Sequence, residues 1–262
     1  MFTYDRGYGD GGGDEQGDCD RLTIHREGTR WLSSGFDGGY LTADAAHNLT
    51  VPEGFDRTDL SAYAAERLGD LPAGPTLLTG VSQRHARGAR LDPVAVVATA
   101  GLSNPASLPV EIDRVSEMKS HSTGYQSGHE TEVGDVRGDR GDGPDPRRPG
   151  TVNVFVGTTR SLDDGALAGL LATAVEAKAA TLLAAADVPG TTSDAVVVGC
   201  DPDGEPSAFA GSATEVGAAT RACVRDAVLA SLVSRYPDGE PPSLEEAEYG
   251  LSTQGRSTVF EP

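Results

Sequence analysis

The chain has 262 residues with 40 acidic against 21 basic side chains, so its net charge at pH 7 is −19. This charge excludes a basic face that holds a nucleic-acid backbone, so we expect no nucleic-acid partner. No apolar run approaches the ~18 residues of a membrane span, and residues 1–20 lack a signal peptide's apolar stretch, which predicts a soluble, cytoplasmic protein. The three cysteines, Cys19, Cys200 and Cys223, lack C-x-x-C spacing and predict neither a disulfide framework nor a zinc site.

The acidic excess occurs together with several apolar segments, so it indicates a folded protein with an acidic surface and not a disordered acidic chain. Only Lys119 and Lys178 among the 21 basic residues are lysines, and the others are arginines. Repulsion between like charges destabilises a compact acidic protein, and concentrated salt screens that repulsion. Scarce lysine, abundant Asp and Glu and many small residues therefore predict a halophilic, archaeal source.

Apolar periodicity and turn residues predict the elements in chain order, after a Gly- and Asp-rich stretch at 1–20 that predicts a disordered tail. Strands are predicted at 21–26, 29–33, 75–81, 93–99, 151–157, 193–200 and 208–210; helices are predicted at 58–69 (capped by Asp56 or Thr58), from Asp163 or Asp164 to about Ala186, and at 218–236; a polar tail follows at 237–262. The alternation of strands and helices predicts an α/β fold, with a mixed β-sheet packed with helices in a single domain over 21–236.

Two segments stand apart from this pattern. Residues 33–39 contain three glycines and predict a tight loop, because glycine permits positive φ. Residues 111–148 show no sustained apolar period and predict a flexible insertion. His121 and His129 lie in that insertion, and because no third ligand accompanies them the sequence favours solvated loop histidines over metal ligands.

The predicted helix that begins at Asp163 or Asp164 carries an unusual lysine. Its apolar stripe consists of Leu167, Leu171, Ala174, Val175 and Leu182. Lys178 falls within this stripe, four residues from Ala174 and four from Leu182. Removing an ammonium group from water is costly, so a buried lysine suits a base or a hydrogen-bond donor to a substrate oxygen. The alternative is that Lys178 extends its ammonium to solvent at the edge of the domain.

Polar residues also gather where the predicted strands begin or end. Residues 190–194, Gly-Thr-Thr-Ser-Asp, place hydroxyls and a carboxylate before a buried strand, where they suit a polar ligand. The alternative is a turn in which Asp194 accepts hydrogen bonds from its own backbone amides. Residues 99–105 follow a buried strand, at the end where open α/β sheets usually bind ligands. Asn153 interrupts an apolar strand and therefore needs a hydrogen-bond partner.

Six of these segments, taken in order, resemble the adenosylcobinamide amidohydrolase family of the CbiZ type. The matching segments lie over about residues 30–235 and are Ser33–Gly39, Thr99–Pro105, Gly150–Asn153, Glu176–Lys178, Gly190–Ala195 and Gly211–Gly217. The chain departs from the family pattern at three places. It has Phe36-Asp37-Gly38-Gly39 where the family has Leu-Asn-Gly-Gly, Ser193 where the family has threonine, and the insertion at 111–148.

The resemblance implies hydrolysis of the amide that joins aminopropanol to the corrin ring of adenosylcobinamide, which gives adenosylcobyric acid in cobalamin salvage. The cobalt arrives with this corrinoid substrate, so we expect no protein-bound cofactor or metal. The resemblance places catalytic residues at Lys178, Thr191, Ser193 and Asp194, and substrate-binding residues at Ser33, Ser34, Asp37, Gly38, Gly39, Ser103, Asn104, Thr151, Asn153 and Gly190.

Amide hydrolysis needs a nucleophile, a proton for the departing amine and stabilisation of an oxyanion. On this hypothesis Asp194 activates water, and Lys178 polarises the carbonyl or protonates the amine. A hydroxyl of Thr191, Ser193 or Ser103 either donates to the oxyanion or attacks directly, with Lys178 as its base.

Asn104 and Asn153 would orient the amide side chains of the corrin. Two other functions stay open: a non-catalytic corrinoid-binding protein that uses the same site, and an amidohydrolase of another small amide. The sequence also leaves open whether the chain forms a homo-oligomer.

The acidic surface predicts that folding depends on salt. Lowering the concentration of potassium chloride removes the screening of like charges, so the thermal unfolding midpoint should fall as salt is withdrawn. Circular dichroism melts over a potassium chloride series measure this dependence. A protein that stays fully folded without salt would contradict the halophilic interpretation.

Overall fold

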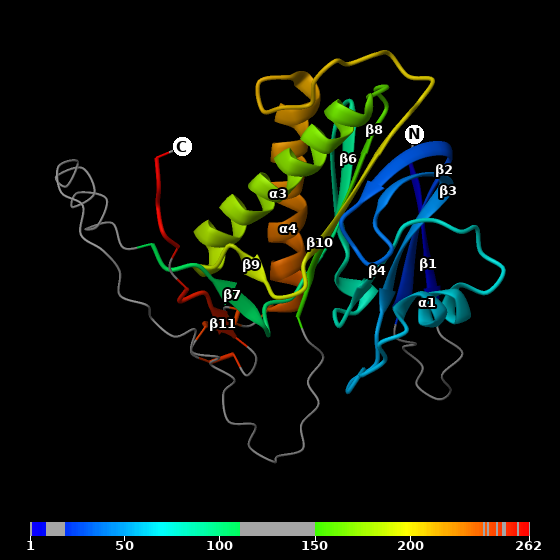
Figure 1. The fold of residues 1–262 in the computed structure, drawn as a ribbon. Helices are drawn as coiled ribbons and strands as arrows, with labels where there is room; N and C mark the ends of the chain where they lie inside the picture. The colour runs from blue at the N-terminus through cyan, green and yellow to red at the C-terminus, as the bar shows by residue number, and fades with distance from the viewer. Residues whose placement is uncertain are drawn as a thin grey trace.

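The computed structural model describes residues 2–8, 19–110 and 150–261, except residues 238, 240, 245, 248, 249 and 256. These residues form an α/β domain in which two long helices cover one face of a large mixed sheet (Figure 1). The predicted fold class, a mixed sheet packed with helices in one domain, is confirmed.

The large sheet has eight strands within the described residues. They are β1 (Thr3–Tyr8), β2 (Cys19–Ser33), β3 (Gly39–Thr50), β4 (Thr76–Thr79), β5 (Arg87–Leu91), β6 (Val94–Ala100), β8 (Val152–Thr158) and β10 (Ala195–Cys200). Their order is β4-β3-β2-β10-β8-β6-β5, and β1 pairs with the first half of β2. The β8–β10 and β3–β4 pairs are parallel, and the other pairs are antiparallel.

A smaller sheet and the helices complete the described part of the chain. The smaller sheet has the order β11-β7-β9, formed by β7 (Pro105–Ser107), β9 (Gly190–Thr191) and β11 (Leu251–Ser252). The helices are α1 (Leu60–Leu68), the 3-10 turn η1 (Gln83–His85), α3 (Asp164–Ala186) and α4 (Glu215–Arg235). In Figure 1 the smaller sheet lies beside the C-terminal end of α3, and α1 lies on the opposite side of the large sheet.

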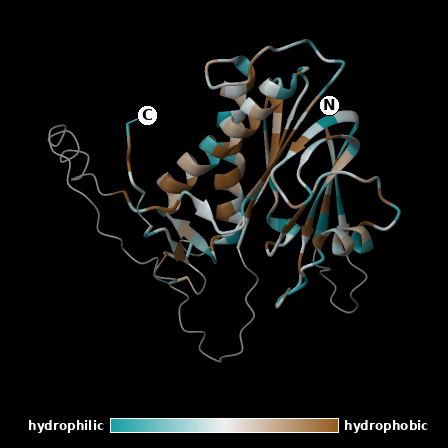
Figure 2. Cartoon of the chain, in the orientation of Figure 1, coloured by the Kyte–Doolittle hydropathy of each residue, from teal (hydrophilic) through white to brown (hydrophobic). Residues whose placement is uncertain are grey.

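The central strands β6, β8 and β10 are buried on both faces. Successive strand residues point to opposite faces, so Val152, Val154 and Val156 join the core under α3 and α4, while Phe155 joins a second core on the other face. The helix α4 packs on β5, β6 and β8, and α3 packs on β10 and α4. This burial explains the nearly continuous valine runs of these strands, which Figure 2 shows as hydrophobic.

The second core is organised around the only tryptophan. Trp31 in β2 is 1% exposed, its indole N–H donates to the carbonyl of Ala43, and its ring meets the edge of Phe2. Gly199 in β10 lies directly beneath the indole, where a Cβ atom would approach Trp31 Cε3 to 2.5 Å. The absence of a side chain at Gly199 therefore makes room for the tryptophan.

Helix ends follow local capping signals. Asp163 caps α3 by accepting a hydrogen bond from a backbone N–H of the first turn, which confirms one of the two predicted caps. The helix α1 begins later than predicted, because Asp59 occupies the N-cap position in place of Asp56 or Thr58. It ends as predicted at Gly69, which has a φ of 56°.

The strand predictions were confirmed in part. The segments predicted as strands at 21–26 and 29–33 form one continuous strand, β2, which continues through a tight turn into β3. Neither β3 nor β5 was predicted, because polar and basic residues interrupt the alternation of apolar and polar side chains along these strands. The residues 208–210, predicted as a strand, form none.

The terminal segments are more ordered than predicted. Within the predicted disordered tail at 1–20, residues 3–8 form β1 and Cys19 opens β2. Within the predicted polar tail at 237–262, β11 pairs with β7. The predicted insertion at 111–148, with His121 and His129, lies outside the described residues.

One helix resembles a membrane span by length and composition. In the part of the chain that the structure describes, α3 passes this test, but half of its apolar window is buried inside the protein. A core helix of a soluble protein has the same character. The predicted apolar stripe of α3 is mostly in the core, whereas Val175 is 39% exposed.

The contact between Trp31 and Gly199 yields a stability prediction. The Gly199→Ala substitution overpacks the second core and should lower the free energy of unfolding by about 1–3 kcal/mol. Gly169→Ala in α3 is the matched control, because its Cβ would meet nothing within 4 Å and alanine favours helix. Urea unfolding at fixed salt measures both, and equal stabilities would contradict the prediction.

Candidate functional site

The motifs meet at one edge of the large sheet. The register places Ala100, the last residue of β6, opposite Val152, and places Asn153 opposite Ala195 at the start of β10. Because β6 runs antiparallel to β8 and β10, the carboxyl end of β6 lies beside the amino ends of the other two strands. Residues 101–105 therefore follow the carboxyl end of β6, with residues 150–153 and 190–194 beside them, and the binding of a ligand at this edge stays a prediction.

A buried ion pair lies at this edge. The Lys178 ammonium donates to Asp194 Oδ2, and the two side chains are 8% and 10% exposed. The alternative, an ammonium that extends to solvent, is wrong. Lys178 lies in the C-terminal half of α3, on the face that covers β9 and β10. A buried charge of this kind needs a partner with good geometry and further hydrogen bonds.

Asp194 collects donors from three separate segments. Its Oδ1 accepts from the Val152 backbone N–H at 2.8 Å and from Thr191 Oγ1 at 2.5 Å, and its Oδ2 accepts from the Thr191 N–H at 3.0 Å and from Lys178. A carboxylate offers about four lone-pair positions, and all are used here. The turn interpretation of Asp194 is thus partly right, because Thr191 is a local donor, but the other donors come from β8 and α3.

Gly190 makes space for the ion pair. A Cβ atom at this position would lie 2.5 Å from Asp194 Oδ2 and 3.0 Å from Lys178 Nζ. The backbone around it is fixed by β9, in which Gly190 pairs with Ala106 and Thr191 pairs with Pro105 of β7. Gly190 therefore supports the site by its missing side chain.

Hydroxyl and amide groups surround the ion pair. Ser193 is exposed, and its Oγ lies 3.3 Å from Thr151 Oγ1 and 3.5 Å from Asn104 Nδ2. Asn104 is 3% exposed and donates to Thr192 Oγ1 at 2.6 Å, while its Oδ1 has no hydrogen-bond partner among the described residues. A buried amide oxygen without a partner is costly, and it suits an acceptor position for a ligand.

Ser103 and Gly150 join the two loops of the site. The Gly150 N–H donates to Ser103 Oγ, and a Cβ at Gly150 would lie 2.5 Å from the Ser103 backbone nitrogen. Gly101 lies on the other side of the same contact, with its Cβ position 3.4 Å from Gly150 Cα. The backbones therefore pack against each other, which explains why both matching segments contain glycine.

The hairpin residues form a neighbouring group with structural contacts. Ser34 exchanges hydrogen bonds with the backbone of Val196, and Ser33 Oγ accepts from the Gly35 N–H. Asp37 is exposed and accepts from the hydroxyl of Ser61 in α1.

The turn itself uses unusual backbone angles. Asp37 has a φ of 50° and Gly39 a φ of 112°. Asn and Asp adopt this region more readily than other residues, which explains how aspartate replaces the family's asparagine. A Cβ at Gly38 would lie 2.5 Å from the Ser33 carbonyl oxygen, so this turn also requires glycine there.

Asn153 belongs to a separate, fully buried network. Its Nδ2 donates to Asn48 Oδ1 at 2.9 Å and to the Leu78 carbonyl at 3.0 Å, which confirms that it has partners. Asn48 in turn donates to Gln83 Oε1 and Thr99 Oγ1. Asn48 and Gln83 were missed, since the contacts of this network join β3, η1 and β6 across long sequence separations.

No group of three or more His, Cys, Asp or Glu side chains within the described residues could hold a metal ion. The absence of a protein-bound cofactor stays a prediction. The reactive groups of the described site are thus an ammonium, a carboxylate, hydroxyls and amides, which are groups that acyl-transfer chemistry uses.

The fold and the site together define an α/β protein with a buried lysine–aspartate pair at a polar sheet edge. The family model for adenosylcobinamide amidohydrolase, CbiZ, matches residues 21–239. A protein of Halobacterium salinarum named adenosylcobinamide amidohydrolase is 50% identical over 248 residues, which cover 92% of this chain and 96% of that protein. The chain therefore belongs to the adenosylcobinamide amidohydrolase family, which confirms the resemblance, and a relative from Halobacterium fits the predicted halophilic, archaeal source.

The ion pair predicts a large stability effect when one partner is removed. Lys178→Met or Asp194→Leu alone should lower the free energy of unfolding by about 3–5 kcal/mol, because the remaining charge stays buried without its partner. The double variant should lose less than the two single losses together. Arg221→Gln, which breaks an exposed pair with Glu176, is the control and should change stability by less than about 0.5 kcal/mol. Urea unfolding gives all four values, and additive losses would contradict coupling.

Proposed function

We propose that the protein hydrolyses the amide that joins aminopropanol to the corrin ring of adenosylcobinamide, with adenosylcobyric acid and aminopropanol as products. Family membership supports this substrate, and one structural observation carries the assignment of the site. The buried ion pair of Lys178 and Asp194 lies where the segments 99–105, 150–153 and 190–194 converge. In the reaction the oxygen of water bonds to the carbonyl carbon, the C–N bond breaks, and the departing nitrogen takes a proton.

The geometry favours a positioning role for Asp194. All of its lone-pair positions accept hydrogen bonds, which leaves none for the proton of an attacking water. Its carboxylate instead holds the Lys178 ammonium and the Thr191 hydroxyl in fixed positions. In this proposal Lys178 donates a hydrogen bond to the developing oxyanion or a proton to the departing amine.

Ser193 carries an exposed hydroxyl at the site. Its Oγ is near Thr151 Oγ1 and Asn104 Nδ2, so it is oriented by neighbours and still open to a ligand. We assign it contact with the scissile carbonyl, as a donor to the oxyanion or as the attacking group. The unpartnered Oδ1 of Asn104 would accept from an amide N–H of the corrin.

The remaining predictions about partners follow from the same substrate. The cobalt is part of adenosylcobinamide, so this proposal requires no protein-bound cofactor. A cytoplasmic location suits a salvage enzyme, and the charge of −19 does not suit nucleic acid. The corrinoid is the proposed partner, and the reaction as written needs a single copy of the chain.

Release of aminopropanol from adenosylcobinamide, in buffer of high salt concentration, tests the function. Lys178→Ala, Asp194→Asn and Ser193→Ala should each lower kcat at least about a hundredfold, while Asp226→Asn on the exposed side of α4 should leave it unchanged. Circular dichroism melts of each variant establish that it is folded.

Three outcomes decide between the functions. Corrinoid binding by the wild type without release of aminopropanol would favour a non-catalytic binding protein. If another small amide inhibits the reaction and is hydrolysed in preference to adenosylcobinamide, the protein is an amidohydrolase of that amide. Near-normal turnover in one variant would reject the role of that residue.

A further inference from the structure

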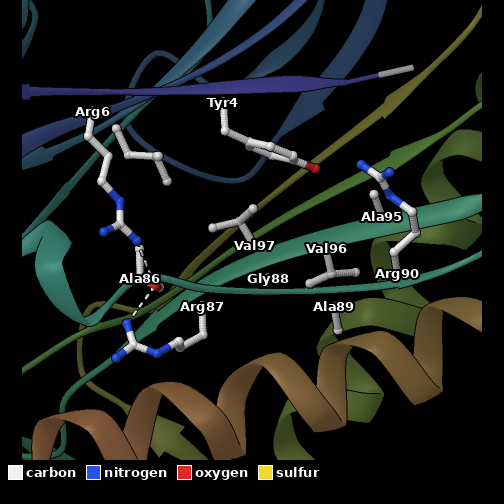
Figure 3. Close-up of a pocket in the computed structure, with 11 residues that line it drawn as sticks. Tyr4, Arg6, Ala86, Arg87, Gly88, Ala89, Arg90, Ala95, Val96 and Val97 are labelled. Carbon is white, nitrogen blue, oxygen red and sulfur yellow. Dashed lines mark hydrogen bonds between the residues drawn. The ribbon is translucent and has the colours of Figure 1, made fainter.

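A cavity separate from the ion-pair site lies between β1 and the β5–β6 hairpin. Its volume is about 360 Å³, and it is lined by Tyr4 and Arg6 of β1, Leu22 of β2, Ala86, Arg87, Gly88, Ala89 and Arg90 along β5, and Ala95, Val96 and Val97 of β6 (Figure 3). None of these residues belongs to the site of Lys178 and Asp194. Three arginines and a tyrosine hydroxyl thus share one cavity in a chain of net charge −19.

Two of the arginines converge on one carbonyl. Arg6 Nη2 donates to the Ala86 oxygen at 3.1 Å, and Arg87 Nη1 donates to the same oxygen at 2.9 Å. Figure 3 shows the two guanidinium groups on either side of this oxygen. Like charges held this close repel each other, and a carbonyl dipole does not neutralise them. Arg6 is exposed and Arg87 half-buried, so both charges are still reached by solvent and would be open to an anion that enters the cavity.

Neither arginine forms an ion pair with a carboxylate among the described residues. Arg87 also donates to the Arg84 carbonyl and to the hydroxyl of Ser234, both uncharged groups. Some other arginines of the chain do form such pairs. Arg57 pairs with Asp59 and Glu66, and a second arginine, Arg160, likewise contacts two glutamates. Arg21, Arg84 and Arg235 also form no ion pair with a carboxylate among the described residues, so what distinguishes Arg6 and Arg87 is that they meet at one carbonyl oxygen inside a cavity.

The neighbouring histidine shows the same excess of positive charge. The pKa of His85 is lowered, first by burial and then by the nearby charges of Arg84, Arg235 and Arg87. No carboxylate appears among the groups that act on it. The corner formed by η1 and the start of β5 is thus positive over several residues.

The other end of the cavity carries a second polar pair. The Tyr4 hydroxyl points toward the guanidinium of Arg90, whose charge opposes the burial that raises the pKa of Tyr4 (Figure 3). Gly88 and Val97 lie between the two ends, so the floor there is apolar. The absence of a side chain at Gly88 leaves the middle of the cavity unfilled.

We propose that this cavity binds a small oxyanion, a phosphate or carboxylate group, between the guanidinium groups of Arg6 and Arg87. The planar fork of arginine matches the oxygens of both groups, and the charge-assisted hydrogen bonds would replace the missing carboxylates. The Tyr4–Arg90 end would contact the rest of a small organic anion. The site is independent of the amide hydrolysis.

A competing explanation comes from the sheet edge. The strand β5 ends the large sheet, and charged side chains on edge strands prevent pairing with another chain. That explanation requires positive charge anywhere along β5. It does not require Arg6 of β1 to meet Arg87 at one oxygen, so the two explanations predict different effects of Arg6→Gln.

Binding is tested by isothermal titration of the full chain with inorganic phosphate and, in a second series, with succinate, at a fixed molar concentration of potassium chloride. We expect saturable one-to-one binding of at least one of these probes. The probe that binds more tightly shows whether the cavity prefers a phosphate or a carboxylate group. Arg6→Gln and Arg87→Gln should each weaken that binding at least about tenfold. Arg225→Gln, which breaks an exposed pair with Asp226, should leave it unchanged.

Thermal melts with the same anions give a second measurement. A bound anion raises the unfolding midpoint more when it binds more tightly, with a logarithmic dependence on its concentration relative to Kd, whereas the general salting effect of phosphate acts equally on all variants. Equal shifts in the wild type and in Arg6→Gln would overturn the proposal, as would absence of saturable binding. If the arginine variants aggregate but bind the anion with unchanged affinity, these side chains serve to prevent pairing of the sheet edge with another chain. That result would also overturn the proposal.

Discussion

The site depends on a single buried ion pair. Lys178 and Asp194 are both removed from water, so each needs the other and Asp194 needs further donors. Those donors are backbone and side-chain groups of Thr191 and the N–H of Val152. One carboxylate therefore fastens the middle of α3, the loop before β10 and the start of β8. A change in any of these contacts would displace the groups that surround the proposed reaction.

The direction of β6 explains how distant segments share this place. In an all-parallel sheet, the carboxyl end of β6 and the amino ends of β8 and β10 would lie at opposite edges. Because β6 runs antiparallel to β8, residues 101–104 lie beside residues 150–153, and their glycines allow the backbones to touch. The parallel β8–β10 pair, connected through α3, then adds Lys178 and residues 190–194 to the same edge.

Local signals in the sequence predicted the helices and central strands well. The Asp163 cap and the valine runs depend on neighbours in the chain, so the sequence shows them directly. The network that joins Asn48 to Gln83 and Thr99 was not predicted, because these partners are far apart in sequence. The same limit applies to the contacts of Asp194, whose role as the base that activates water stays a hypothesis. Its role as a holder of other groups depends on Val152 and α3, which only the fold brings near.

In this acidic chain, several basic side chains lie in direct contact with a carboxylate. Concentrated salt screens charges that are separated by solvent, but it weakens contact pairs and buried pairs much less. Arginines such as Arg57 and Arg160 therefore use contact pairs at the surface, and Lys178 uses a buried one. A guanidinium that has no carboxylate in contact gains little from the surrounding acidic surface in such a solvent. For the couple of Arg6 and Arg87, the proposed anion within the cavity would supply such a contact pair.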